Sequence, residues 1–399
     1  MKTLIYNEVN TDMIDILKNG GLVGVPTETV YGLAANALNE EAVRNIYEVK
    51  GRPEVKPLSV MVSGKEEMER YCVKIPAAAY TLAESFWPGP LTIILKSRDV
   101  IPSLVRAGGE TVGLRCPDHP LTLELLKCSR LPLAAPSANP SGEKSPQTAS
   151  EVLRYFDGKI EGILDGGECS VGVESTIIDL SHTPYRILRQ GALGEEEIHN
   201  ALREDLKVIG ITGGSGCGKT TALYLLKEQG AEIIDCDALY HEMLNNDEEM
   251  IRDLETAFPK AVNGGHVDRR ILASIVFHDP DALARLNEIT HSHIRDQVQK
   301  ILNQCVMDGK TMAAVDAIAL IESGLATECD TVLGVLSSRE NRLNRIMKRD
   351  NISQQAAEDR LNAQQSDEFF INNCDKVIYN DSTEQQFSAA CLAYFSEVL

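Results

Sequence analysis

The residues best suited to chemistry form a glycine-rich segment in the second half of the chain. Residues 213–220 read GGSGCGKT, which matches the phosphate-loop pattern G-x-x-x-x-G-K-[ST] at every fixed position. In such a loop, backbone N–H groups surround phosphate oxygens, the lysine adds a positive charge and the next hydroxyl ligates Mg²⁺. The expected nucleotide ligands are Gly214, Ser215, Gly216, Cys217, Gly218, Lys219, Thr220 and Thr221, with Thr220 also on Mg²⁺.

Two carboxylates follow the next apolar stretch, in the segment AEIIDCDALYHEML. They are Asp235 and Asp237, at the carboxyl end of a predicted strand, and in a parallel sheet that edge faces the ligand. A carboxylate there can accept the proton of an attacking hydroxyl or hold Mg²⁺ through water. One of them can instead cap the following helix, and for Asp235 this alternative stays open. Asp237 and Lys219 are therefore the catalytic candidates of this half.

In the first half, three cations lie within seven residues, at the end of a predicted helix and in a proline-bearing loop. They are Lys50, Arg52 and Lys56, and they favour a local anion site within an acidic domain. The alternative is a helix C-terminus whose basic side chains complement the helix dipole. Hydroxyls at Thr27, Thr29 and Tyr31 alternate along a strand and turn, so they project to one side. Further polar candidates are Arg115, Ser137, Asn139, Ser141, Ser145, Ser175, Thr176 and Arg189.

The elements that must position these residues alternate between strands and helices in both halves. In the first half, apolar runs such as 91–96 and 112–116 alternate with helical stretches such as 40–50 and 120–128, which predicts an α/β domain. In the second half, a strand at 208–212, the glycine-rich loop and a helix begin a doubly wound parallel sheet, continued by strands at 313–320, 331–336 and 376–380. The domains are expected at 1–200 and 206–399.

Length and composition agree with this division. A chain of 399 residues exceeds the usual size of one hydrophobic core, and 43% hydrophobic with 25% charged residues is globular composition. Both halves are acidic: residues 1–200 hold 20 basic and 27 acidic side chains, and residues 201–399 hold 19 and 32. We therefore expect no general nucleic-acid binding. With no apolar run of membrane length, no signal peptide and no CxxC pair, we expect a cytoplasmic protein without a structural metal.

The second half resembles the dephospho-CoA kinases across about 190 residues, through ITGGSGCGKTT, IIDCDALYHEML, GHVDRRILASIVF, LNEITHSHIR, DAIALIESGL, RLNRIMKRD and RLNAQQ in family order. The resemblance implies that ATP, with Mg²⁺, phosphorylates the ribose 3′-hydroxyl of dephospho-CoA in the last step of coenzyme A biosynthesis. It implies that Asp237 is the base and that Asp316 and Glu322 lie beside the site. The lid helices would close over ATP with Arg342, Arg345, Arg349 and Arg360. Departures from the family pattern are His241, Ile318-Ala319-Leu320 and His291-Ser292.

The first half resembles the YrdC family of threonylcarbamoyl-AMP synthases over about residues 8–195, through PTETVYGL, KGRPEVKPLSV, WPGPLT, VGLRCP, APSANPSG, GVESTIID and ILRQG. The implied reaction joins L-threonine, bicarbonate and ATP with Mg²⁺, for the N6-threonylcarbamoyl modification of adenosine 37 in tRNA. The implied threonine ligands are Thr29, Arg115, Ala135 and Ser175. The implied ATP ligands are Lys50, Arg52, Lys56, Thr111, Ser137, Asn139, Ser145 and Arg189, with Arg52 and Lys56 catalytic. Met61 stands where many members have histidine.

Together these resemblances predict a bifunctional enzyme with the tRNA-modification machinery downstream and no membrane partner. The alternative is that only one half is catalytic and the other is a nucleotide-binding or tRNA-presenting module. The hydrogenase maturases also share a YrdC module, but they carry cysteine-rich zinc segments that this chain lacks.

Overall fold

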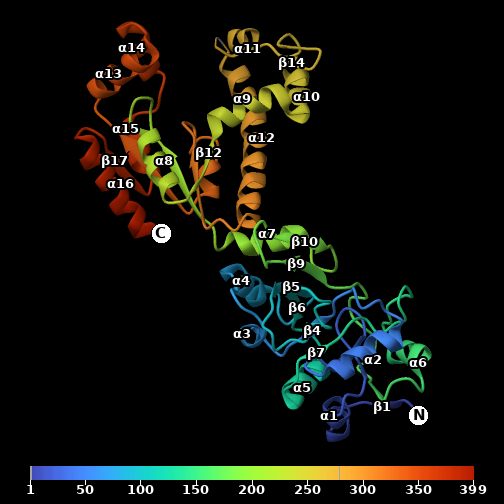
Figure 1. Ribbon diagram of the computed structural model, residues 1–399. Coiled ribbons are helices and arrows are strands. Elements are labelled where there is room, and N and C mark those ends of the chain that lie inside the picture. Colours follow the sequence, from blue (N-terminus) through green and yellow to red (C-terminus); the bar gives the residue numbers. More distant parts are fainter. Residues whose placement is uncertain (1, 278) are drawn as a thin grey trace. The chain divides into compact units, whose positions relative to one another are not determined.

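The computed structural model describes residues 2–277 and 279–399, which form two compact units (Figure 1). The first comprises Met1–Asp205 with Met307–Gly309, and the second comprises Leu206–Val306 with Lys310–Leu399. Residue 200, the expected limit of the first domain, lies inside helix α7 (Glu195–Arg203). In the described ranges no helix combines the length and the apolarity that crossing a membrane requires.

The first unit is built on a ten-stranded mixed sheet in the order β1-β8-β2-β3-β7-β4-β6-β5-β9-β10. It contains parallel pairs such as β4·β6 and β5·β9 and antiparallel pairs such as β2·β3 and β5·β6. The strands are β1 (Leu4–Tyr6), β2 (Val23–Val25), β3 (Gly32–Asn36), β4 (Ser59–Met61), β5 (Leu91–Lys96), β6 (Thr111–Arg115), β7 (Leu133–Ala134), β8 (Gly162–Leu164), β9 (Thr176–Asp179) and β10 (Arg186–Arg189). The expected twisted α/β sheet domain is confirmed.

Helices of the first unit bury their apolar stripes against this sheet. Met13 and Leu17 of one helix and Leu125 and Leu126 of another pack on strands β2, β3, β4, β7 and β8 in one buried cluster. These helices are α1 (Thr11–Lys18) and α5 (Pro120–Ser129), and the others are α2 (Glu40–Lys50), α3 (Met68–Tyr71), α4 (Ala77–Phe86) and α6 (Ala149–Phe156), with α7 and a 3-10 turn at Lys65–Glu67. The side chain of Asn39 caps α2 by accepting from two backbone N–H groups, and Gly51 ends the helix in a left-handed conformation.

The second unit contains the expected parallel sheet, in the order β12-β15-β11-β16-β17. All four pairings are parallel, so the carboxyl ends of the strands share one edge. The strands are β11 (Lys207–Thr212), β12 (Glu232–Asp235), β15 (Met312–Asp316), β16 (Thr331–Leu336) and β17 (Lys376–Tyr379). A small antiparallel hairpin, β13 (Val262–Asn263) and β14 (His266–Val267), lies outside this sheet.

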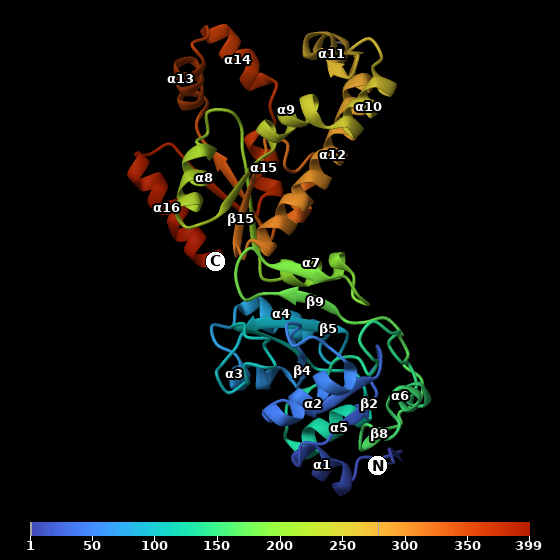
Figure 2. The same cartoon turned by 45° about the vertical axis from the view of Figure 1, so that its right-hand side comes forward.

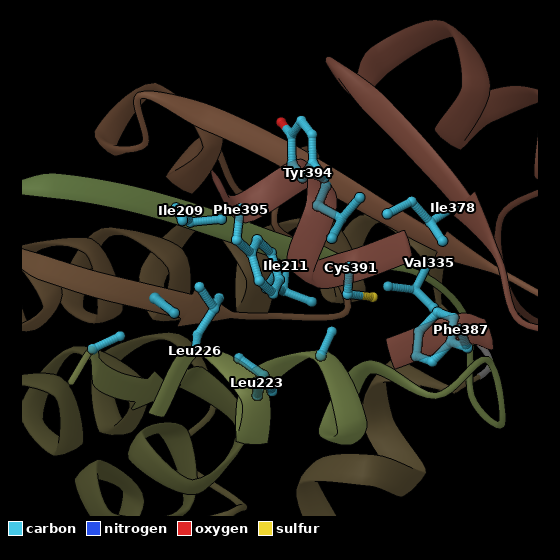
Figure 3. Packing of buried hydrophobic residues seen from close by; sticks show 14 of the residues in the cluster. Ile209, Ile211, Leu223, Leu226, Val335, Ile378, Phe387, Cys391, Tyr394 and Phe395 are labelled. Carbon is cyan, nitrogen blue, oxygen red and sulfur yellow. The ribbon is translucent and has the colours of Figure 1, made fainter. Parts of the chain in front are cut away.

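Helices cover both faces of the parallel sheet. Figure 3 shows one face, where helices α8 (Lys219–Glu228) and α16 (Glu384–Val398) pack Leu223, Leu226, Phe387 and Phe395 on the strands. Helix α15 (Asp367–Asn373) contacts β16 and β17 from the other face, where Cys374 lies close to Gly334. The central strand β11 is buried over its last five residues because helices exclude water from both sides.

The remaining helices of this unit form two groups beyond the carboxyl edge of the sheet, as both views show (Figure 2). One group pairs α13 (Arg339–Asp350) with α14 (Gln354–Asn362) around a small core of Ile346, Ala357 and Leu361. The other holds α9 (Cys236–Asn246), α10 (Glu248–Ala257), α11 (Arg269–Val276) and part of the long α12 (Pro280–Met307), with a 3-10 turn at Leu325–Glu328 nearer the sheet.

Candidate active sites

The glycine-rich loop joins β11 to α8, as its sequence predicts, so its backbone N–H groups gather at the amino end of a helix. Gly213, Gly216 and Gly218 have φ values of 136°, 78° and 105°, a region that side chains rarely adopt. At Gly218 a Cβ would also lie 2.1 Å from Nδ2 of Asn380. Lys219 begins α8, and its Nζ donates to the carbonyl of Gly213 at 2.8 Å, so it folds back across the loop.

Three aspartates lie near Lys219 at the carboxyl edge of the sheet. Asp235 and Asp316 are register partners on β12 and β15, and Asp237 is the second residue of α9. Asp235 accepts from the backbone N–H of Ala238 at 2.9 Å, and so it caps α9. Oδ1 of Asp316 is buried and has no hydrogen-bond partner among the described residues.

Burial and nearby charges raise the pKa of two of these carboxyls. Burial raises the pKa of Asp316 to about 6, and Asp235 and Asp237 raise it as well, while Lys219 opposes the shift. Partial burial and the charge of Asp235 raise the pKa of Asp237, and Lys219 and His241 oppose that shift. Lys219 is thus the cation that holds both carboxyls closer to ionisation.

A pocket of about 210 Å³ opens beside Asp237. Its wall includes Tyr240, His291, Ala319 and Ser323, from α9, α12 and the segment after β15. Burial lowers the pKa of His291, and Glu322 partly offsets this shift, so a neutral imidazole lines the wall. Ala319, which departs from the family pattern, therefore lies in this pocket, together with His291, whose neighbour Ser292 is the departing residue. The other departures are placed elsewhere: His241 is 3.4 Å from the guanidinium of Arg269, and Ile318 is exposed.

The four lid arginines fall into two pairs. Arg342 and Arg345 contact the outside of the loop, where Arg342 Nε donates to the carbonyl of Ser215 at 3.1 Å and Arg345 Nη1 to that of Gly216 at 3.0 Å. Arg349 and Arg360 instead both pair with Asp350, at the end of α13. Of the four, Arg349 and Arg360 have the more exposed side chains, at 61% and 47%.

In the first unit, a pocket of about 260 Å³ collects residues from six distant segments. Six of the predicted ligands line it: Arg52, Arg115, Ala135, Ser137, Ser175 and Arg189. Met61 also lines the pocket, with its side chain close to Gly32. Thr29 lies behind the wall, fully buried, and its hydroxyl accepts from Arg115 at 2.8 Å.

A buried ion pair orients Arg115. Its Nη2 donates to Oε1 of Glu28 at 2.8 Å, and Oε2 of Glu28 accepts from the backbone N–H of Asp118 at 3.0 Å. Both side chains are less than one-tenth exposed, so the pair holds the guanidinium in a defined direction at the pocket wall. Glu28 was not among the predicted residues, although it lies within PTETVYGL between two of the predicted hydroxyls.

Arg189, which also lines this pocket, contacts two neighbouring residues. Its guanidinium donates to the carbonyl of Ser175 at 2.8 Å and pairs with Glu174, which also accepts from Ser145 at 3.1 Å. Ser175 Oγ lies 2.9 Å from Thr92 Oγ1. Glu174 and Thr92 also line the pocket, although neither was predicted from the sequence. The position of Glu174 beside Ser175 in GVESTIID could have indicated it.

Lys50 lies behind the pocket and does not line it. It is 3% exposed, and its Nζ donates to the carbonyls of Ser137 and Asn139. Burial, with the charge of Arg52, lowers the pKa of Lys50 to about 7. Asn139 is likewise buried, whereas Lys56 is exposed and Thr111 begins β6. None of these four residues lies on the pocket wall.

Comparison with known proteins matches a different family to each unit. The family model Sua5_yciO_yrdC, described as "Telomere recombination", matches residues 15–191, and the model described as "Dephospho-CoA kinase" matches residues 207–386. The solved structure of a dephospho-CoA kinase from Campylobacter jejuni is 26% identical, covers 48% of this chain and 96% of its own, and has a TM-score of 0.37.

Two curated relatives align with the first unit. A threonylcarbamoyl-AMP synthase from Pyrococcus abyssi is 49% identical over 188 residues, which are 47% of this chain and 55% of the relative. A putative threonylcarbamoyl-AMP synthase from Methanocaldococcus jannaschii is 41% identical over 193 residues, which are 47% of this chain and 90% of the relative. The chain spans about half the length of several such relatives, including those from Pyrococcus abyssi and Bacillus subtilis.

Proposed function

We propose that both units of this chain are enzymes. The premise is that the chain belongs to the Sua5/YciO/YrdC family and carries a dephospho-CoA kinase domain. The first unit forms L-threonylcarbamoyl-AMP from L-threonine, bicarbonate and ATP. The second transfers the γ-phosphoryl group of ATP to the 3′-hydroxyl of dephospho-CoA. The observation that carries this proposal is that each unit gathers its own charged side chains around its own pocket.

The first reaction requires charge stabilisation more than a side-chain nucleophile. The carbamate of threonine attacks the α-phosphate of ATP, so negative charge grows on the phosphoryl oxygens and on the leaving pyrophosphate. Arg52 and Arg189 line the pocket and can offset this charge. Lys56, on the exposed loop beside Arg52, would add its charge from the solvent side.

Threonine recognition is assigned to the wall around Arg115. Its guanidinium, held by Glu28, is placed to receive a carboxylate, and Ser175 and Ala135 line the same pocket. Thr29 acts through Arg115, since its buried hydroxyl accepts from that guanidinium. Lys50 acts indirectly as well, because it holds the two carbonyls of the loop that carries Ser137, a proposed ATP ligand.

In the second unit, Asp237 is the proposed base and its pocket is the proposed site of the acceptor hydroxyl. A raised pKa increases the basicity of the carboxylate towards a hydroxyl proton. Lys219 would contact the transferred phosphoryl group after leaving the carbonyl of Gly213. Arg349 and Arg360 would meet the outer phosphates of ATP, because they are the exposed pair of lid cations.

The residues present fit a Mg²⁺ ion carried by ATP. The exposed Thr220 hydroxyl can ligate the ion directly, and Oδ1 of Asp316, buried without a partner in the described ranges, can accept from its water ligands. The ion would neutralise charge on the β- and γ-phosphates. We also infer Mg²⁺ with ATP in the first unit and a cytoplasmic location, where both sets of substrates are available.

Paired assays on the full chain test the proposal. One measures pyrophosphate release that depends on threonine and bicarbonate, and the other measures ADP release that depends on dephospho-CoA. Both activities are expected from the same preparation. Loss of one with retention of the other would support the alternative, in which a single unit is catalytic and the other only binds.

A further inference from the structure

Side chains from two other segments of the second unit hold the outside of the phosphate loop. Three consecutive carbonyls, those of Ser215, Gly216 and Cys217, each accept from a side chain outside the loop. The donors are Nε of Arg342 at 3.1 Å, Nη1 of Arg345 at 3.0 Å and Nδ2 of Asn380 at 2.9 Å. Arg342 and Arg345 belong to α13, and Asn380 follows β17.

Two of the three donors also bind each other, and the third binds a fourth residue. Arg345 Nη2 donates to the carbonyl of Asn380 at 2.9 Å, and Arg342 Nη2 donates to Oε1 of Gln364 at 2.8 Å. Gln364 in turn binds Ser215 twice, through the backbone N–H at 2.9 Å and the hydroxyl at 2.8 Å. Arg342 and Asn380 are each 8% exposed, so these contacts are protected from water.

An anion cradle requires this arrangement on its outer side. When successive N–H groups turn inward to phosphate, the carbonyls of the same peptides turn outward. There they have no hydrogen-bond donor from a helix or a strand. Buried carbonyls need donors, and guanidinium groups satisfy them while placing positive charge behind the loop. The same side chains cannot reach inward to phosphate while they hold these carbonyls.

We propose that Arg342, Arg345 and Asn380 form a clamp that holds the loop in its phosphate-binding shape and ties it to the lid, which consists of helices α13 and α14. The inference deepens the proposed kinase function and rests on it for the ligand of the loop. Arg342 and Arg345 are then positioning residues, whereas Arg349 and Arg360 are the lid cations that contact phosphate. This differs from the expectation that all four arginines close over ATP.

The affinities for ADP and for ATP distinguish a residue that shapes the loop from a residue that binds the γ-phosphate. A clamp that shapes the cradle affects ADP and ATP alike, because both nucleotides place a β-phosphate in the loop. A ligand of the γ-phosphate affects ATP and spares ADP. We therefore expect Arg345→Ala and Asn380→Ala to weaken ADP and ATP binding by the same factor, on the order of tenfold. Arg349→Ala is expected to weaken ATP more than ADP.

The measurement is titration calorimetry of the full chain with Mg·ADP and with Mg·ATP, with every variant made in an Arg52→Ala/Arg189→Ala background that removes the proposed ATP ligands of the first unit. Arg339→Ala is the matched control, because Arg339 lies on the same helix but donates to Asn362 of the lid and not to the loop. A selective loss of ATP binding in Arg345→Ala would overturn the clamp, and so would unchanged affinity for both nucleotides. Thermal unfolding of each variant shows whether the second unit is still folded.

Gly214 offers a test from the side of the loop, in case the arginine variants fail to fold. A Cβ at this position would lie 2.1 Å from Nη2 of Arg342 and 2.8 Å from Oε1 of Gln364. Gly214→Ala should therefore displace Arg342 and weaken ADP and ATP binding by the same factor, and where Arg342→Ala folds the two variants should lose about the same ADP affinity. The double variant should lose little more than either single variant. Additive losses would contradict the clamp.

These outcomes remain distinct from failure of the proposed function. A wild-type chain that binds both nucleotides but does not phosphorylate dephospho-CoA refutes the kinase proposal and leaves the ADP and ATP comparison valid. A wild-type chain that binds neither nucleotide overturns the clamp, because the clamp presumes a phosphate-binding loop.

Discussion

Three carboxyls with the same chemistry occupy different environments at the edge of the second unit's sheet. Asp235 is already used as a helix cap, Asp237 faces a pocket and Lys219, and Asp316 keeps one buried oxygen without a partner in the described part of the chain. Differences of this kind, more than residue type, assign separate roles to neighbouring acids. The structure thus favours a capping role for Asp235 and leaves Asp237 as the proposed base.

We predict that Asp237→Asn lowers kcat for dephospho-CoA phosphorylation by roughly 10²- to 10⁴-fold, because an amide cannot accept the hydroxyl proton. Asp235→Asn should have little effect, since asparagine caps a helix about as well as aspartate. Steady-state kinetics of both variants, with ATP affinity measured separately, check this. Equal losses in the two variants would remove Asp237 from the role of base.

The pKa of Asp316 predicts a pH effect on stability. Because this pKa is raised from 3.8 to about 6 in the folded protein, the folded state binds more protons than the unfolded state between these values. This carboxyl therefore stabilises fully below about pH 4, and its contribution is lost as the pH rises through about 6. The unfolding free energy of Asp316→Asn, followed in metal-free buffer from pH 4 to 7, should lack this decrease. Parallel pH curves for wild type and variant would refute the assignment.

At the scale of elements, the end of α2 shows how one turn of chain serves two purposes. Lys50, the last residue of the helix, is buried and holds the segment of Ser137 and Asn139. Arg52, past the left-handed Gly51, reaches the pocket and also donates to the carbonyl of Pro57 at 3.0 Å. The helix end therefore positions a loop on one side and supplies a cation on the other.

We predict that Arg52→Ala and Lys56→Ala each remove threonine-dependent pyrophosphate release, because both cations offset charge on ATP. Only Arg52→Ala should also lower the melting temperature, by the equivalent of about 1 kcal/mol, since it alone loses hydrogen bonds to the loop backbone. Both quantities are measured on the same two variants. Full turnover with earlier melting would instead favour basic residues that only stabilise a helix end.

At the scale of the whole molecule, each unit has its own sheet, its own buried core and its own pocket. The residues that line one pocket all belong to one unit. Two reactions that share only ATP as a substrate do not require a common site. We therefore treat the two activities as separable by single substitutions.

Lys219→Ala tests this separation. It should abolish dephospho-CoA phosphorylation, because loss of a charge from a preorganised phosphoryl site raises the barrier by about 3 kcal/mol or more. Threonine-dependent pyrophosphate release from the same preparation should stay within about twofold of wild type, which is within the usual effect of a distant, independent site. A joint fall of both activities in a folded variant would show that the units are coupled.

Local sequence determined the elements that carry the chemistry. The order of apolar stretches, glycines and an amphipathic run places the loop of residues 213–220 between β11 and α8, because strand, turn and helix propensities act over short range. The same reasoning predicted Asp235 and Asp237 at a strand end and the α/β class of both units. Motifs of the first half likewise contained the six predicted ligands that line its pocket.

Only the tertiary structure decided what each charged side chain contacts. Glu28 and Glu174 are ordinary acids in the sequence, and they become partners of Arg115 and Arg189 because segments about 90 and 15 residues apart meet at the pocket. The four lid arginines are the same residue type, yet Arg342 and Arg345 bind the loop, whereas Arg349 and Arg360 pair with Asp350. The partner of a long side chain depends on packing and on the need to satisfy buried carbonyls. Neither can be read from the spacing of residues along the sequence.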